Sequence, residues 1–213
     1  MILVAVDRDG TLNHNNRSKP DGPYYVLSPE QFEWIEGAKA GLIDLLCSDD
    51  ILVHIVTSQN CISEGLVSKQ QVDLVHAKMN DELEALCDKR VPVSVIFGVK
   101  ESDRAKAEAK AEAINAALED FEKEGFFIEK VYVVGDTEGD ILAGTVLKQL
   151  LEEPRASRIA DDGVTVFASV TCKTIHVELD YTSEKDRYVA AADYHVKSFR
   201  EAVDIILDLD MEE

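Results

Sequence analysis

The sequence predicts an α/β protein with a Rossmann-like, doubly wound parallel sheet and helices on both of its faces. Short apolar runs rich in valine and isoleucine alternate with amphipathic helical patterns along the chain, and this alternation is typical of βαβ units. Two of the apolar runs, residues 2–6 and 131–134, end directly in turns that carry aspartates. Because open parallel sheets bind ligands beyond the carboxyl ends of their strands, we expect the functional site at that edge.

The chain has 213 residues, which suits a single domain spanning residues 1–213 with a full hydrophobic core. Its formal net charge is −20, from 42 acidic and 22 basic residues. Such a surface repels the phosphates of nucleic acids and anionic lipids, so we expect neither as a partner.

No apolar run approaches the length of a membrane span, and the predicted first strand starts at residue 2, without a signal peptide. The four cysteines form no CxxC pair and no Cys/His cluster, so we interpret them as reduced thiols rather than zinc ligands. We therefore expect a cytoplasmic protein, either a monomer or a small homo-oligomer. The cysteines are Cys47, Cys61, Cys87 and Cys172.

Residues 2–6 are consecutive apolar residues, which indicates a short strand buried on both faces. Asp7 and Asp9 follow it, and side chains two apart on an extended backbone point the same way. Like charges this close repel each other unless they share a cation or a proton. One aspartate can attack a phosphorus atom and bind Mg²⁺, while the other moves a proton to the leaving oxygen. Gly10 and Thr11 permit a sharp turn and offer N–H groups to an anion, although a plain surface turn also fits them.

The segment after these aspartates, residues 14–29, is rich in Asn, Pro and Gly and is predicted to be a loop beside the site. Residues 37–47 have apolar positions at helical spacing, and residues 51–56 predict a second buried strand, which completes a right-handed βαβ unit. Thr57 and Ser58 end this strand beside the end of the first. Their hydroxyls can hold a phosphate oxygen there, and helix capping is the alternative role.

Ser68 and Gln71 match a capping box, and they open an amphipathic helix whose apolar stripe we assign to the core. Residues 91–99 are rich in β-forming residues and predict a third strand. The basic segment at residues 100–110 leads into a long helix that ends near Gly125. The stripe of the first of these helices is formed by Val72, Val75, Met79, Leu83 and Leu86.

The fourth predicted strand, residues 131–134, again delivers carboxylates to its carboxyl end. Gly135 allows a tight exit from the strand. Mg²⁺ takes few protein carboxylates and keeps waters, so Asp136 suits a direct or water-mediated ligand. Asp140 can contact the shell of the metal or hold the loop, and an N-capped helix that continues to about residue 151 also explains it.

The remainder of the chain is less clearly patterned. Residues 154–163 are polar and predict a loop that ends in a turn. Residues 164–170 and 174–179 are two β-rich runs, of which one joins the parallel sheet and the other forms a hairpin at its edge; the sequence leaves open which. Ser198 and Glu201 match a second capping box, which opens a closing helix.

These motifs together resemble the haloacid dehalogenase-like (HAD) phosphohydrolases. The DxDGTL string at residues 7–12 is similar to their first motif, Thr57 to their second and the GDTEGD string at residues 135–140 to their fourth. The segment YYVLSPEQFEWIEGA, residues 24–38, resembles the capless histidinol-phosphatase and heptose-bisphosphate phosphatase branch. The resemblance covers residues 2 to about 209 and implies a HAD-type fold.

The resemblance implies an Mg²⁺-dependent phosphomonoester hydrolase with an aspartyl-phosphate intermediate. Asp7 is the expected nucleophile and Asp9 the expected acid and base. The third motif of the family is a lysine at the start of the helix after residue 100, and we expect Lys106 in this role, with Arg104 beside it at the phosphate. Lys100 and Lys110 stay open, although a solvated helix face with glutamate partners is favoured for Lys110. The expected metal ligands are Asp7, Asp9, Asp136 and Asp140.

The chain departs from the branch in two places that bear on substrate. Glu64 stands where the heptose-bisphosphate phosphatases have an arginine, and residues 86–98 contain only Cys87 where those proteins often carry a zinc loop. Residues 13–51 and 59–104 leave no room for a lid domain, so we expect an open site. We expect a sugar phosphate or similar small metabolite as substrate. The alternatives are a polynucleotide 3′-phosphatase, a protein phosphatase and a non-catalytic phosphate-binding protein.

Overall fold

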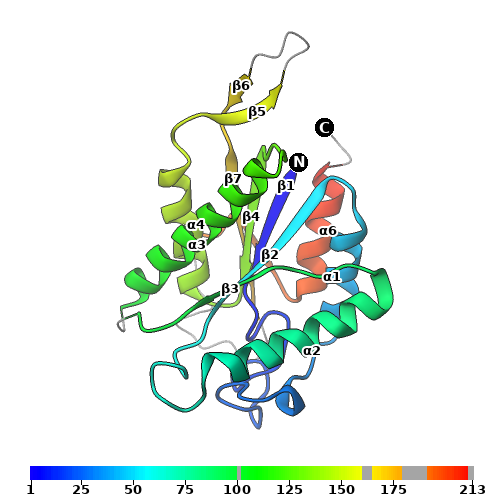
Figure 1. The fold of residues 1–213 in the computed structure, drawn as a ribbon, viewed down its shortest axis with the longest axis vertical. Helices are drawn as coiled ribbons and strands as arrows, with labels where there is room; N and C mark the ends of the chain where they lie inside the picture. Colours follow the sequence, from blue (N-terminus) through cyan, green and yellow to red (C-terminus); the bar gives the residue numbers. More distant parts are fainter. Residues whose placement is uncertain (100–101, 160–164, 179–190, 211–213) are drawn as a thin grey trace.

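A computed structural model describes residues 1–99, 102–159, 165–178 and 191–210 of the chain. Its centre is a six-stranded parallel sheet in the order β3-β2-β1-β4-β7-β8 (Figure 1). This architecture confirms the predicted Rossmann-like α/β fold. The strands are β1 (Ile2–Val6), β2 (Ile51–Ser58), β3 (Val93–Ile96), β4 (Lys130–Gly135), β7 (Thr171–Val177) and β8 (Tyr194–Val196).

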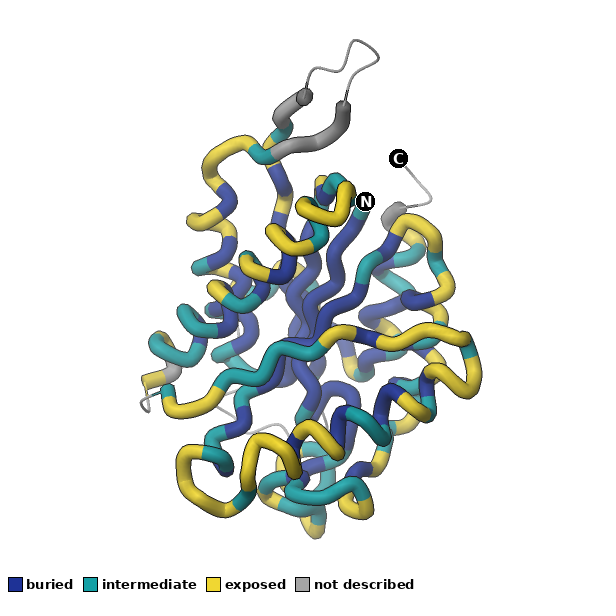
Figure 2. Tube along the Cα trace, in the orientation of Figure 1, coloured by how far each residue is buried: buried dark blue, intermediate teal, exposed yellow. Residues whose placement is uncertain are grey.

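Helices cover both faces of the sheet, and the alternation of side chains along β1 shows why. Ile2, Val4 and Val6 pack into one apolar cluster, while Leu3 and Ala5 pack into a second cluster on the opposite face. Figure 2 shows the central strands almost entirely buried. The first cluster takes in α1 (Ala38–Cys47), α2 (Lys69–Cys87) and α6 (Phe199–Asp210), and the second takes in α3 (Asp103–Lys123) and α4 (Glu138–Leu150).

Capping side chains fix where several helices begin. The hydroxyl of Ser68 accepts from the N–H of Gln71, whose side-chain oxygen accepts from the N–H of Ser68 at 2.9 Å, as the predicted capping box requires. Ser198 caps α6 in the same way by accepting from the N–H of Glu201. The carboxylate of Glu201, however, accepts from the N–H of Lys197 rather than from that of Ser198.

The region after α4 differs from the prediction. Residues 155–159, expected in a polar loop, form strand β5 (Arg155–Ile159), which pairs antiparallel with β6 (Thr165–Ala168) in a separate two-stranded sheet. The second β-rich run starts earlier than predicted, at Thr171, and it is the one that joins the parallel sheet as β7. The guanidinium of Arg155 donates to Glu122 and Asn115 of α3, so polar contacts rather than an apolar pattern anchor the first strand of the hairpin.

The site edge of the sheet is shaped by short connections. Between β1 and β2 the structure has the 3₁₀ helix η1 (Pro29–Gln31) and α1, and between β2 and α3 it has α2 and β3. The described parts of these two connections therefore contain no lid domain, in agreement with the predicted minimal cap. Figure 1 places the β5–β6 hairpin at the opposite end of the molecule from α2 and from the loop that follows β1. None of the described helices is both long and apolar enough to span a membrane.

Candidate active site

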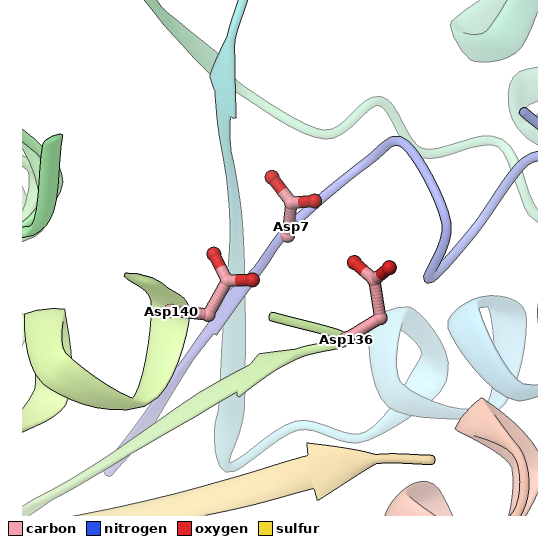
Figure 3. A group of neighbouring side chains, drawn as sticks. All are labelled: Asp7, Asp136 and Asp140. Atoms are coloured by element: carbon pink, nitrogen blue, oxygen red, sulfur yellow. The ribbon is translucent and has the colours of Figure 1, made fainter. Parts of the chain in front are cut away.

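Three aspartates meet where the carboxyl ends of β1 and β4 lie side by side. The backbone N–H of Asp7 donates to the carbonyl of Val134 at 2.9 Å, so the chain leaves β1 against the end of β4. One carboxylate oxygen each of Asp7, Asp136 and Asp140 lies within 4.8 Å of the others, and all three residues are buried. Figure 3 shows the three carboxylates converging from the end of β1, the end of β4 and the first turn of α4. This strand order reverses between β1 and β4, which is where such sheets bind ligands.

Lys110 of α3 supplies the positive charge of this cluster. Its ammonium donates to Oδ1 of Asp7 at 2.7 Å and also to Oδ1 of Asp140. The expectation that Lys110 belongs to a solvated helix face is therefore wrong, since Lys110 is only 8% exposed. Ala107, Ala111 and Ile114 are buried on the same stripe of α3, and this spacing carries Lys110 inward.

Burial makes the ionised state of the cluster costly. It raises the pKa of Asp7 to about 7, with Lys110 acting against this shift and Asp140 adding to it. Burial also raises the pKa of Asp136 well above its usual range, and the charges of Asp7 and Asp140 act in the same direction. Burial disfavours the charge on Lys110, but Asp140 and Asp7 outweigh this effect and raise the lysine pKa. The lysine is therefore a cation held among carboxylates.

The donor set fits a hard divalent cation such as Mg²⁺. When all three carboxylates are ionised, they and the ammonium of Lys110 carry a formal charge of −2. Oδ1 of Asp136 is buried without a hydrogen-bond partner in the described part of the chain. A buried oxygen in this state has lone pairs available to bind a cation. Oxygen-only ligands are typical of magnesium, calcium and manganese sites.

Asp9 lies in the same pocket but its side chain is held apart from this cluster. Arg8 donates to it in a fork, from Nη2 to Oδ2 at 2.8 Å and from Nε to Oδ1 at 3.2 Å. Asn13 donates to Oδ1 at 2.9 Å and Gln59 to Oδ2 at 2.6 Å. Burial acts to raise the pKa of Asp9, but the charge and hydrogen bonds of Arg8 outweigh it, and the pKa is lowered. The carboxylate expected as a fourth metal ligand is thus turned toward Arg8, outside the three-aspartate group.

The chain is similar to known proteins in sequence and in fold. No family model matches the sequence. The chain is 25% identical over 142 residues to D-glycero-beta-D-manno-heptose-1,7-bisphosphate 7-phosphatase from Rhodopseudomonas palustris, covering 65% of this chain and 74% of that protein.

Two solved structures have the same fold. The D,D-heptose 1,7-bisphosphate phosphatase from B. bronchiseptica, complexed with magnesium and phosphate, superposes with a TM-score of 0.65 at 17% identity, over 98% of this chain and 99% of that one. A protein from Burkholderia xenovorans assigned to the haloacid dehalogenase-like hydrolases gives a TM-score of 0.52 at 10% identity, over 97% of each chain. The chain resembles a heptose-bisphosphate phosphatase in sequence and haloacid dehalogenase-like hydrolases in fold. The resemblance to the heptose-bisphosphate branch is confirmed.

The residues that resemble the second motif of the HAD phosphohydrolases lie at the end of β2. The hydroxyl of Thr57 accepts from Nε2 of Gln59 at 2.8 Å, and the hydroxyl of Ser58 is buried without a hydrogen-bond partner among the described residues. Thr57 and Ser58 both line the pocket that contains Asp7 and Asp9. Gln59, which links Thr57 to Asp9, was not predicted, because a glutamine after a strand has no local signature of this role.

Gly10 and Thr11 do not offer N–H groups to the pocket in this structure. The N–H of Gly10 donates to the carbonyl of Asn13 at 2.9 Å, and that of Thr11 points to the carbonyl of Arg8 at 3.4 Å. Gly10 contributes space instead: its φ is +94°, and a Cβ there would lie 2.7 Å from Cγ of Asp136. The expected anion contacts of these two residues are thus replaced by hydrogen bonds within the loop.

The two basic residues expected at the phosphate lie in different places. The side chain of Arg104 is 85% exposed and pairs with Glu108 one turn along α3, so it points to solvent, away from the pocket. Lys106 lines the pocket, one turn before Lys110 on the same face of the helix. The lysine that contacts the carboxylates is therefore Lys110, and Lys106 lies further out. Lys100 lies outside the described residues.

The pocket at this edge of the sheet has a volume of about 270 Å³ and a largely polar wall. The loop at residues 14–29 reaches it, as predicted, through Asn15, Asn16, Arg17, Tyr24 and Tyr25. The hydroxyl of Tyr25 donates to Glu64 at 2.9 Å, which ties this loop to the segment after β2. None of these five side chains was predicted individually, because composition identifies the segment only as a loop.

Proposed function

We propose that this protein is a phosphatase that hydrolyses phosphomonoesters with Mg²⁺ through an aspartyl phosphate on Asp7, and that its substrate is a sugar phosphate or a similar small metabolite. The observation that carries the proposal is the position of Asp7, which lines the pocket while its carboxylate contacts Lys110 and lies in one group with Asp136 and Asp140. A nucleophilic carboxylate needs neighbouring positive charge and an open approach, and Asp7 has both.

In the first step, an oxygen of Asp7 attacks the phosphorus while the bond from phosphorus to the ester oxygen breaks. Asp9 gives a proton to the departing alcohol. Because its pKa is lowered, Asp9 is ionised in the free protein, and the proton enters with the substrate, whose second phosphate pKa is about 6. Lys110 balances the charge around Asp7, and the hydroxyls of Thr57 and Ser58 are placed to hold phosphoryl oxygens.

In the second step, a water molecule attacks the same phosphorus, and Asp9 accepts its proton. Phosphate leaves and the carboxylate of Asp7 is restored. Asp7, Asp136 and Asp140 would hold Mg²⁺, which when bound supplies positive charge to the phosphoryl oxygens and to the crowded carboxylates. Asn13 and Gln59 keep the carboxylate of Asp9 in one orientation through both steps.

The substrate class follows from the size and the polar wall of the pocket. A volume of about 270 Å³ is suited to a small phosphate ester. The relatives named as heptose 1,7-bisphosphate phosphatases make that bisphosphate the first compound to assay. Glu64 accepts a hydrogen bond from Tyr25 of the pocket wall, and its carboxylate would repel a second phosphate placed beside it. Sugar monophosphates are therefore the matched comparison.

The test is hydrolysis of nitrophenyl phosphate by the purified protein, with Mg²⁺ and after its removal by a chelator. We expect Asp7→Asn to lose at least about 10³-fold in kcat, as removal of a nucleophile does elsewhere. Asp73→Asn on the exposed face of α2, paired with Lys69, makes the same chemical change and should keep full activity. Full activity of Asp7→Asn, or hydrolysis that is independent of Mg²⁺, would contradict the proposal.

A substrate panel then separates this function from its alternatives. Sugar phosphates should be hydrolysed faster than a 3′-phosphorylated oligonucleotide, which the net charge of −20 repels, and faster than a phosphopeptide. A preference for the oligonucleotide or the phosphopeptide would replace the proposed substrate class. Phosphate binding without hydrolysis of any of these compounds would indicate a non-catalytic protein.

A further inference from the structure

We propose that His76 of α2 is a positioning residue for proton transfer, which acts on Asp9 through the buried guanidinium of Arg8. The inference rests on the proposed function, in which Asp9 is the acid and base. Three residues form the chain of contacts. Nε2 of His76 lies 2.7 Å from Nη1 of Arg8. Nε and Nη2 of the same guanidinium donate hydrogen bonds to both carboxylate oxygens of Asp9.

The chemistry of the two side chains fixes the direction of the first contact. A guanidinium has only donors, so Nη1 of Arg8 donates and Nε2 of His76 accepts. The ring is therefore neutral, with its proton on Nδ1. Arg8 is fully buried, and without this acceptor the Nη1 edge of a buried cation would face the protein interior unpaired.

The second contact turns this arrangement into a positioning device. Arg8 meets Asp9 through Nε and Nη2, a planar fork that sets the plane of the carboxylate. A guanidinium is rigid, so holding Nη1 at His76 also fixes the fork at Asp9. Asp9 lines the pocket, and the angle of its carboxylate decides which oxygen can reach the leaving group.

The support behind His76 is rigid as well. Val75 and Met79 of α2 are fully buried in the apolar cluster on that face of the sheet. The helix therefore carries His76 from the core toward the loop after β1, although no residue of α2 lines the pocket among those described. Asp9 is thus oriented by a rigid element that is separate from the strands bearing the catalytic groups.

The test compares two aryl phosphates of nearly the same shape. Nitrophenolate leaves without needing a proton, whereas the more basic leaving group of phenyl phosphate needs one. We expect His76→Leu to lower kcat/KM for phenyl phosphate at least about tenfold and to change the value for nitrophenyl phosphate far less. His76→Gln, which returns an acceptor near the position of Nε2, should recover most of the loss.

The matched control is His54→Leu, which removes another buried histidine that contacts Ser94 and lies outside the pocket. It should leave the ratio of the two kcat/KM values unchanged. Equal losses on both substrates in His76→Leu would show a role in folding alone and overturn the inference. Asp9→Asn distinguishes failure of this inference from failure of the proposed function. If the ratio of the two kcat/KM values changes in Asp9→Asn but not in His76→Leu, only the role of His76 is overturned. If the ratio is unchanged in Asp9→Asn, Asp9 is not the acid.

A measurement on the unaltered protein covers the case in which His76→Leu does not fold. Nitrogen-15 chemical shifts of the histidine rings distinguish the two neutral tautomers. We expect His76 to carry its proton on Nδ1 and to have an unprotonated Nε2. A proton on Nε2 would rule out the contact with Arg8 and overturn the inference.

Discussion

The ammonium nitrogen of Lys110 lies 2.7 Å from Oδ1 of Asp7 and bonds Asp140 as well, whereas Lys106, one turn earlier, lines the pocket. We expect Lys110→Met to lower kcat at least about 10²-fold, because charge developing at Asp7 loses its fixed partner. Lys106→Met should chiefly raise KM. Steady-state kinetics with nitrophenyl phosphate and saturating Mg²⁺ measure both effects.

The control for this pair is Lys123→Met at the exposed end of the same helix, which should leave both constants unchanged. A larger loss of kcat in Lys106→Met than in Lys110→Met would return the third-motif role to the residue that the sequence favoured.

Lys110 shows how far the site could be predicted from the sequence. Asp7 and Asp136 were predictable because each follows an apolar strand, and parallel strands bring their carboxyl ends to one edge. The expected place at the start of the helix favoured Lys106. The apolar stripe through Ala107, Ala111 and Ile114 already contained the better signal, since Lys110 lies on it.

Other features had no local signal. The contact from His76 to Arg8 joins residues 68 positions apart, and only the packing of α2 against the sheet brings them together. Strand β5 is polar, and its ends are set by pairing with β6 rather than by apolar alternation. Strand β8 has three residues, too few to show a period of two.

Gly10→Ala should weaken Mg²⁺ binding by the proposed site. A Cβ at this position would overlap the carboxylate of Asp136, so the side chain has to turn out of the cluster. We expect the Mg²⁺ concentration for half-maximal activity to rise at least about tenfold, which corresponds to a loss of about 1.4 kcal/mol in binding.

Gly125→Ala is the matched control for this change. Gly125 has the same φ of +94° but nothing within 4 Å of an added Cβ. It should show the backbone strain, about 1 kcal/mol of lost stability, without any change in Mg²⁺ dependence. Equal effects of the two variants on Mg²⁺ dependence would mean that the overlap with Asp136 has no part in metal binding.

Protonation of His54 should make the fold less stable as the pH decreases. Burial lowers the pKa of His54 to about 4, with Asp120 acting against the shift, while the unfolded chain has a value near 6.5. Between these values the unfolded state binds more protons, so the free energy of unfolding decreases as pH falls below about 6.5. By pH 5 this one group should remove about 2 kcal/mol relative to pH 8.

Denaturant unfolding of the wild type and of His54→Leu at both pH values isolates this contribution. The leucine variant lacks the titrating ring, so the stability advantage of the wild type over the variant should shrink by about 2 kcal/mol from pH 8 to pH 5. A difference that stays constant, or grows as the pH falls, would contradict a neutral buried His54.

Asp136→Asn should stabilise the metal-free protein while it abolishes stabilisation by Mg²⁺. Burial and the neighbouring Asp7 and Asp140 disfavour the charge of Asp136, so a neutral amide of the same shape relieves the repulsion by about 1 kcal/mol or more.

Asp193→Asn provides the opposite case. The pKa of Asp193 is lowered to about 2: burial acts to raise it, but Lys148 and Thr174 outweigh burial, and the loss of that charge should destabilise the fold. Thermal unfolding of the wild type and both variants, each with Mg²⁺ and with a chelator, measures these effects. A lower melting temperature of Asp136→Asn without metal would contradict repulsion among the three carboxylates, and with it the electrostatic reason for a divalent cation at this site.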